Sequence, residues 1–175
     1  MSELLLAALL ALLVALALIA IHAADLLLAA IALGAYGFVM ALLWAAMGAV
    51  DVAFTEAVVG AGATTVLFLA ALLRTSRRRS PWPSRLRWIA AGIAVATGAA
   101  ILAVSSALPQ WGDPAAPASV HVSPRYLERT IPETATPNAV TAVLADYRGY
   151  DTLIETIVIF TAGLGVWLLL GRERA

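Results

Sequence analysis

Two carboxylates interrupt a mostly apolar stretch at residues 48–73, GAVDVAFTEAVVGAGATTVLFLAALL, and one of them lies well inside it. If a membrane helix begins near Asp51, Glu56 lies about 7–8 Å farther along, at about 1.5 Å per residue. A charge at the centre of a membrane costs on the order of 2.5–3.5 kcal/mol. Protonation would reduce that cost, so Glu56 could accept and release protons. Two interpretations remain open: a proton or ion relay, and a structural acid paired with a partner subunit.

Small residues recur every four positions in this stretch, at Ala53, Ala57 and Ala61. Gly60 and Thr64 follow Glu56 at the same spacing. Small residues at this spacing let membrane helices approach closely. We therefore expect Glu56 to face protein and not lipid. Gly60 and Gly62 weaken a regular helix, which permits a kink or a π-bulge, and both distortions are associated with functional sites.

The other carboxylate of this stretch has a simpler interpretation. Asp51 falls where the predicted helix begins, so it can cap the helix and meet the positive end of its dipole. Five residues separate Asp51 from Glu56, which is about 140° around a helix. The two acids therefore share no face, and a hydrolase with paired carboxylates is not expected.

A second group of charges lies near the C-terminus. Arg148, Asp151 and Glu155 are spaced i, i+3 and i+7, which places them in one stripe of a helix. A structural ion network at the helix entry is the favoured interpretation, and a conducting network is the alternative. His22 and Asp25, three residues apart, are interpreted as part of a solvated turn, with a pH-sensitive pair as the alternative.

Residues for bond-making chemistry are missing from the sequence. It has no cysteine and only two histidines, which lie far apart. It contains no glycine-rich phosphate loop, no HExxH and no Gly-x-Ser-x-Gly elbow. The net charge of zero gives no indication of nucleic-acid binding. We expect no enzyme activity, no metal and no cofactor.

The elements that position these residues are membrane helices. The chain has 175 residues, of which 62% are hydrophobic, against about 45–50% in a soluble domain. Its charges are bunched between apolar blocks, as in a polytopic membrane protein. The first block is interpreted as a retained helix and not a signal peptide. We predict an all-α membrane protein with five spans, at residues 4–21, 26–47, 51–73, 88–108 and 152–170.

Arginines predict the orientation of these spans. Six follow the third span and two lie in the C-terminal tail: Arg74, Arg77, Arg78, Arg79, Arg85, Arg87, Arg172 and Arg174. The positive-inside rule makes both regions cytoplasmic and places the N-terminus outside. The expected location is the inner (plasma) membrane of a prokaryotic cell.

The polar regions complete the predicted organisation. Residues 74–87 form an arginine-rich turn between a three-helix module, 1–73, and a two-helix module, 88–175. An external loop is expected at 109–150. Within it, residues 138–147 predict a short amphipathic helix, capped by Asn138 and too short to span a membrane.

Two motifs carry a resemblance to a known family. The stretch GAVDVAFTEAVVGAG resembles the D subunit of membrane-bound hydrogenases, where the pattern is G-A-P-D-V-A-x-T-E-A-x-V-G, with Val50 here in place of proline. Residues 131–170 resemble the E subunit, whose hallmark is N-x-V-x-x-x-L-x-D-Y-R-G-x-D-T-x-x-E. The hallmark is matched by Asn138, Val140, Leu144, Asp146, Tyr147, Arg148, Gly149, Asp151, Thr152 and Glu155. Both subunits correspond to the C-terminal region of the A subunit of Mrp-type antiporters, and the D-like module is similar to the J-type subunit of complex I.

The resemblance implies a place in a multisubunit membrane complex. The chain is expected to be an accessory subunit of an Mrp-type monovalent cation (Na⁺)/proton antiporter, with other subunits, the lipid bilayer, Na⁺ and H⁺ as partners. The alternatives are the membrane arm of a hydrogen-evolving hydrogenase or complex I-like enzyme, and a scaffold that conducts nothing. The resemblance implies a relay formed by Glu56, Thr55, Gly60 and Gly62. It also assigns Asp146, Arg148, Asp151 and Glu155 to an interface or relay network.

Overall fold

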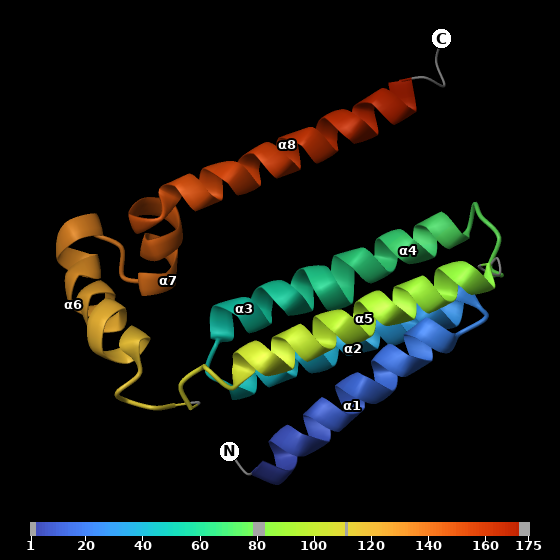
Figure 1. Ribbon diagram of the computed structural model, residues 1–175. Helices are drawn as coiled ribbons and strands as arrows, with labels where there is room; N and C mark the ends of the chain where they lie inside the picture. The colour runs from blue at the N-terminus through green and yellow to red at the C-terminus, as the bar shows by residue number, and fades with distance from the viewer. Residues whose placement is uncertain (1–2, 79–82, 111, 172–175) are drawn as a thin grey trace. The chain divides into compact units, whose positions relative to one another are not determined.

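The computed structural model describes residues 3–78, 83–110 and 112–171, and all regular elements in these ranges are helices (Figure 1). Contacts divide the chain into two units, Met1–Ile93 and Ala94–Ala175, and each is described by itself. The boundary between them falls within helix α5, Ser84–Ser105. The predicted module boundaries at residues 73 and 88 stay predictions.

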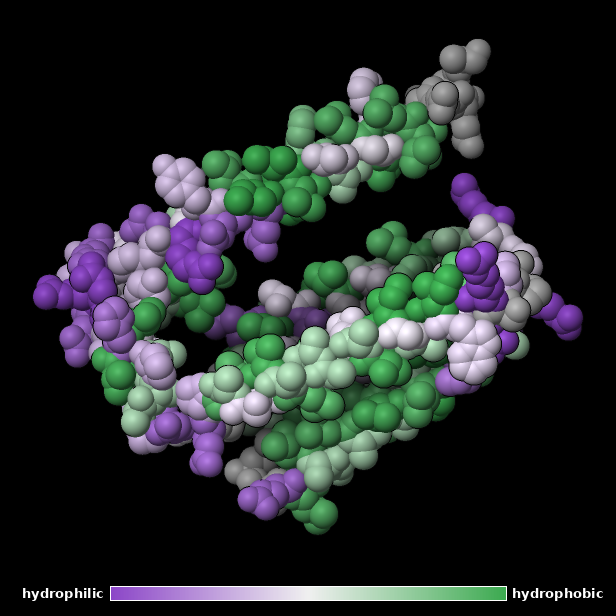
Figure 2. Space-filling model, viewed as in Figure 1, coloured by the Kyte–Doolittle hydropathy of each residue, from purple (hydrophilic) through white to green (hydrophobic). Residues whose placement is uncertain are grey.

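The described residues contain five helical segments long and apolar enough to cross a membrane, which confirms the predicted class. They are Glu3–His22, Leu26–Ala46, Val50–Leu72, Arg85–Ser105 and Gly149–Leu170. Hydrophobic side chains cover the lengths of the helices, and hydrophilic ones gather at their connections (Figure 2). The orientation across the membrane stays a prediction, and Arg79, Arg172 and Arg174, which support it, lie outside the described residues.

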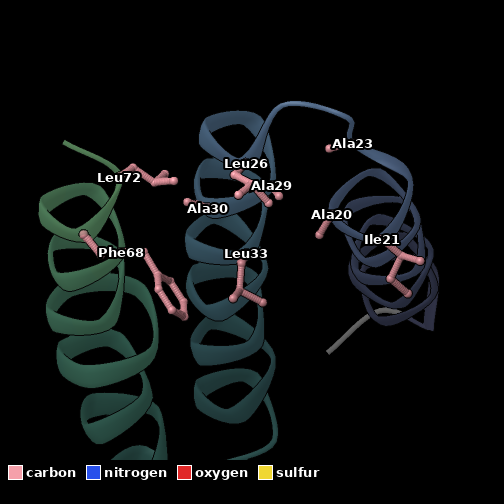
Figure 3. Close-up of a pocket in the computed structure, with 10 residues that line it drawn as sticks. Ala20, Ile21, Ala23, Leu26, Ala29, Ala30, Leu33, Phe68 and Leu72 are labelled. Carbon is pink, nitrogen blue, oxygen red and sulfur yellow. The ribbon is translucent and has the colours of Figure 1, made fainter. Parts of the chain in front are cut away.

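Helix α2 is the centre of the first unit. It packs against α1 on one side and the third span on the other (Figure 3). The elements are α1 (Glu3–His22), α2 (Leu26–Ala46), α3 (Val50–Thr55), the π-helix η1 (Glu56–Ala63) and α4 (Thr64–Leu72). Leu13 of α1 meets Val39 and Leu43 of α2 in a small buried cluster. Most other large apolar side chains are exposed, which suits a surface facing lipid or protein partners.

The contact between α2 and the third span depends on glycine. A methyl group on Gly37 would lie 2.9 Å from both the Ala61 nitrogen and the Gly60 carbonyl carbon. A methyl group on Gly34 would collide with the Thr65 hydroxyl. The two backbones approach closely because these positions of α2 carry no side chain. Of the small residues predicted to allow a close approach, Gly60 and Ala61 lie at this contact, whereas Gly34 and Gly37 of α2 were not predicted.

The Asp25 carboxylate stabilises the α1–α2 turn through two hydrogen bonds. Asp25 is the N-cap of α2 and accepts a 2.8 Å hydrogen bond from the Leu27 N–H. Its other oxygen accepts a 3.0 Å hydrogen bond from Arg77, whose carbonyl oxygen accepts from the Leu26 N–H at 2.8 Å. The Leu27 N–H contributes most to holding the pKa of Asp25 below its ordinary value, with help from Arg77. The partner of Asp25 is therefore Arg77, while His22 bonds to the Leu18 carbonyl at 2.9 Å.

The second unit corrects the predicted loop at 109–150. Much of it is helical: η2 (Ala118–Val122), α6 (Ser123–Thr134), α7 (Ala139–Ala142) and η3 (Val143–Tyr147) precede α8 (Gly149–Gly171). The segment is rich in proline, which favours a loop in a sequence, but the prolines at 124 and 132 both lie within α6. Pro124 stands in the first turn of α6, where no N–H is needed. Pro132 lies near the end of α6, which stops at Ala135 in the left-handed conformation.

The predicted helix at 138–147 is present and packs on α6. The Asn138 side chain caps it by accepting a 3.0 Å hydrogen bond from the Thr141 N–H. Its second half is a π-helix, which the sequence pattern did not indicate.

Gly37→Ala is predicted to destabilise the first unit. The added methyl group forces α2 away from the backbone of η1, and overpacking of this kind costs about 1–3 kcal/mol. The matched control is Gly163→Ala in α8, where a methyl group meets nothing within 4 Å. Thermal unfolding of the purified chain in detergent should show a lower midpoint for Gly37→Ala only. Equal midpoints for the two variants would contradict the close contact.

Candidate functional site

The third span changes its helical register at Glu56. α3 ends at Thr55, and the next eight residues, Glu56–Ala63, form the π-helix η1 before α4 resumes. The Thr64 N–H bonds to the Val59 carbonyl, five residues back, as the π pattern requires. Of the two distortions expected from the sequence, a kink or a π-bulge, the structure contains a π segment. Such π segments are rare and often occur at functional sites.

The Glu56 carboxylate lies between η1 and α2. A methyl group on Gly60 would overlap Glu56 Oε1 and lie 2.8 Å from its carboxyl carbon, so the side chain folds over Gly60. The same oxygen would be 3.2 Å from a methyl group on Gly37 of α2. Glu56 is half-buried. It therefore faces protein, as predicted, in a space that two glycines leave open.

This carboxylate has no charged partner within the described ranges. The ion pairs found there join Arg77 to Asp25, Arg125 to Glu133 and Arg148 to Asp151. No side-chain hydrogen bond of the Glu56 carboxylate occurs among the described residues either. A half-buried acid inside a membrane span is costly when it is ionised and unpaired. The geometry thus suits a group whose partner comes from outside the described chain.

The other predicted relay residues differ in their surroundings. A side chain at Gly60 would displace the Glu56 carboxylate, which occupies that space. A methyl group on Gly62 would instead make an ordinary 3.4 Å contact with the Ala57 carbonyl. The exposed Thr55 hydroxyl donates to the Val52 carbonyl at 3.0 Å, one turn back in its own helix. A relay role for these residues stays a prediction.

The assignment of Asp51 as a helix cap needs correction. α3 begins at Val50, so its N-cap is Ala49, whose side chain makes no capping hydrogen bond. Asp51 stands inside the first turn, where its charge still meets the positive end of the helix dipole. The tight turn at Gly48, with φ at +83°, starts the helix earlier than the carboxylate suggested.

The second motif forms the joint between η3 and α8. Arg148 Nε donates a 2.7 Å hydrogen bond to one oxygen of Asp151, and Nη2 forms an ion pair with the same oxygen at 2.6 Å. The Arg148 N–H bonds to the Val143 carbonyl at 2.8 Å, and the Thr152 hydroxyl donates to the Leu144 carbonyl at 2.6 Å. The motif thus satisfies carbonyl groups that the end of η3 leaves open.

Two members of the predicted network lie apart from this joint. Glu155 and Asp146 are exposed, and neither carboxylate makes a hydrogen bond or ion pair among the described residues. The structure therefore brings Arg148 and Asp151 together and leaves Glu155 and Asp146 outside their pair. A role of these four residues in an interface or a relay stays a prediction.

The sequence did not predict a polar cluster between α6 and η3. The Tyr147 hydroxyl donates a 2.6 Å hydrogen bond to Glu133, whose other oxygen lies 3.6 Å from Arg125. The Tyr126 and Tyr147 rings are 4.9 Å apart between centroids. The bond to Glu133 raises the pKa of Tyr147. Fourteen residues separate tyrosine and glutamate, and only the unforeseen helix α6 brings them together.

The described residues contain no group of three or more His, Cys, Asp or Glu side chains that could hold a metal ion.

The Tyr147 bond predicts an alkaline loss of stability. Because the folded pKa lies above the ordinary value of 10.0, the contribution is complete below that pH and is lost as pH rises through the folded pKa. Tyr147→Phe should remove this loss and lower the thermal midpoint at neutral pH. Tyr150→Phe, at an 85% exposed position, is the control. Midpoints measured from about pH 8 to about pH 11 that are the same for both variants would contradict the assignment.

Two protein families match the chain in succession. The family described as the D subunit of MBH matches residues 11–77, and the family described as the E subunit of MBH matches residues 84–175. The first match holds the π-helix and Glu56, and the second holds the joint between η3 and α8.

Longer proteins and one solved complex are also similar. A Staphylococcus aureus (strain MRSA252) protein named as the putative antiporter subunit mnhA2 is 35% identical over 80% of this chain, and the A subunit of the Na(+)/H(+) antiporter of Alkalihalophilus pseudofirmus is 28% identical over 83%. A chain of the Mrp complex from Dietzia sp. DQ12-45-1b superposes with a TM-score of 0.79 at 32% identity, covering 95% of this chain. This chain spans only 17–18% of the length of these three proteins.

The family matches follow one another along the sequence, and the solved Mrp chain shares the fold over 95% of the residues at 32% identity. The protein therefore belongs to the family of the MBH D and E subunits, with both joined in one chain that is homologous to part of the antiporter A subunit.

Proposed function

We propose that the protein is an accessory membrane subunit of a multisubunit Mrp-type monovalent cation/proton antiporter. It contributes to the ion or proton pathway and to subunit assembly. The observation that carries the proposal is the half-buried Glu56 carboxylate at the first residue of a π-helix, facing α2 without a charged partner among the described residues. The names of the similar proteins, an antiporter A subunit and an Mrp complex, support it.

In the proposed mechanism Glu56 takes up a proton from one side of the membrane and passes it to a group of a partner chain. The neutral form tolerates the apolar surroundings, and the ionised form attracts H⁺ or Na⁺. The π-helix supplies the change of geometry. Each residue gained or lost by a π segment turns the following helix by about 100°. A π-to-α transition would therefore turn α4 relative to Glu56 and open or close the contact with α2.

The second unit acts as a docking element in this proposal. The joint of Arg148, Asp151 and Thr152 fixes the start of α8, and α6 fixes η3 through Tyr147. Much of the α8 surface is apolar and exposed, so it is available to lipid and to neighbouring subunits. In this proposal the chain exchanges ions only as part of the assembled complex.

The relay is tested by Glu56→Gln in the assembled complex. The amide keeps the shape and loses the proton, so cation-dependent proton exchange in vesicles should fall on the order of tenfold or more. Glu128→Gln, an exposed position on α6, is the control for loss of one acid. Subunit content by gel and mass spectrometry shows that assembly is unchanged. Normal exchange by a correctly assembled Glu56→Gln complex would establish the alternative, a scaffold that conducts nothing.

The descriptions of the matching families favour a second candidate, the membrane arm of a hydrogen-evolving membrane-bound hydrogenase. The two candidates differ in the proteins that surround the chain. Affinity purification of the native complex, followed by identification of its subunits, should yield antiporter subunits without redox proteins. Co-purification of nickel–iron and iron–sulfur proteins in equal amounts would overturn the antiporter assignment and leave the Glu56 relay intact.

A further inference from the structure

An apolar groove opens on the first unit where α1 ends, α2 begins and α4 ends (Figure 3). Its volume is about 480 Å³, within the range of roughly 300–1,000 Å³ typical of small-molecule sites. All of its lining residues are Ala, Leu, Ile or Phe; among them are Ile21, Leu26, Ala29, Leu33, Phe68 and Leu72. The Phe68 ring lies between α4 and α2 (Figure 3). Such walls offer nothing to a polar ligand and suit a hydrocarbon chain.

Arginines lie directly beside this groove. Arg74 follows the lining residues Ala71 and Leu72, and its N–H bonds to the Ala71 carbonyl at 3.0 Å. The Arg77 carbonyl is 2.8 Å from the nitrogen of the lining residue Leu26. Arg78 pairs with Asp25 through a backbone bridge. Arg74 and Arg77 are thus tied by backbone hydrogen bonds to residues that line the groove, and Arg78 is tied to Asp25, the neighbour of the lining residue Leu26.

The charges at this end do not balance. Asp25 is the one carboxylate engaged there among the described residues, and its ion pair is with Arg77 at 3.0 Å. Arg74 and Arg78 are exposed, and neither forms an ion pair within the described part of the chain. The end of the groove therefore has an excess of positive charge, held in place by the turn after α4.

We propose that the groove binds an anionic phospholipid. One acyl chain lies along the walls formed by α1, α2 and α4, and the phosphate contacts Arg74 and Arg78. Basic pockets between membrane helices bind anionic lipid head groups in this way. A neutral lipid or an apolar partner helix would fill the groove but leave both arginines without a counter-charge. The site is separate from Glu56 and holds whether or not Glu56 relays protons.

The test compares two probes on the purified native complex in detergent. After delipidation the complex is titrated with phosphatidylglycerol or phosphatidylcholine, and bound lipid is measured by native mass spectrometry. Phosphatidylglycerol should be retained preferentially. The double variant Arg74→Gln/Arg78→Gln should weaken its binding by about tenfold or more and leave phosphatidylcholine unchanged. Arg129→Gln, an exposed arginine of the second unit, should bind like the unmodified protein.

A second pair of variants tests the groove itself. Ala71→Phe fills it from α4 and should reduce phosphatidylglycerol binding, while Ala70→Phe, one residue earlier and not part of the lining, should not. Equal retention of the two lipids, or retention that neither the arginine nor the Ala71 variant changes, overturns the proposal. So does a partner helix seen in the groove of the assembled complex. Subunit content and thermal midpoints confirm that each variant assembles.

Discussion

The close approach of α2 to the third span is the constraint on which the first unit depends. In a membrane no hydrophobic force holds helices together, so packing must do so. Gly37 and Gly60 allow backbone contact, and the space they leave receives the carboxylate of Glu56. One geometric fact therefore has two consequences: the helices pack tightly, and an ionisable group is placed at their interface.

The remaining polar side chains show why Glu56 is different. Hydroxyl groups within the spans bond to carbonyl groups of their own helix, as Thr156 and Thr161 do with Thr152 and Ile157. Some charged groups at the helix ends find partners, as Asp25 does with Arg77. Glu56 is a half-buried acid for which the described chain supplies neither a side-chain hydrogen bond nor an ion pair. The simplest physical account is that its partner is a mobile proton or ion, or a residue of a neighbouring subunit.

Much of this architecture could be predicted because hydropathy and small-residue spacing are local signals. The five spans and the protein-facing side of Glu56 follow from them. Helix α6 could not be predicted, because prolines favour loops. Pro124 and Pro132 are compatible with a helix only because they lie in its first and last turns. The length of η1 could not be predicted either, because glycines at 60 and 62 permit a π-helix without setting its length. The Asp25–Arg77 and Glu133–Tyr147 contacts needed the folded chain to bring distant residues together.

If Glu56 relays protons as proposed, its carboxyl group changes its protonation state as the complex works. Infrared difference spectroscopy tests it most directly, because a protonated carboxyl group has a carbonyl band that its ionised form lacks. Spectra of the assembled complex should show such a band appear or vanish when the coupling cation is added. This band should be missing from Glu56→Gln complexes and unchanged in Glu128→Gln complexes. A band that persists in the Glu56→Gln complex would contradict the proposed relay.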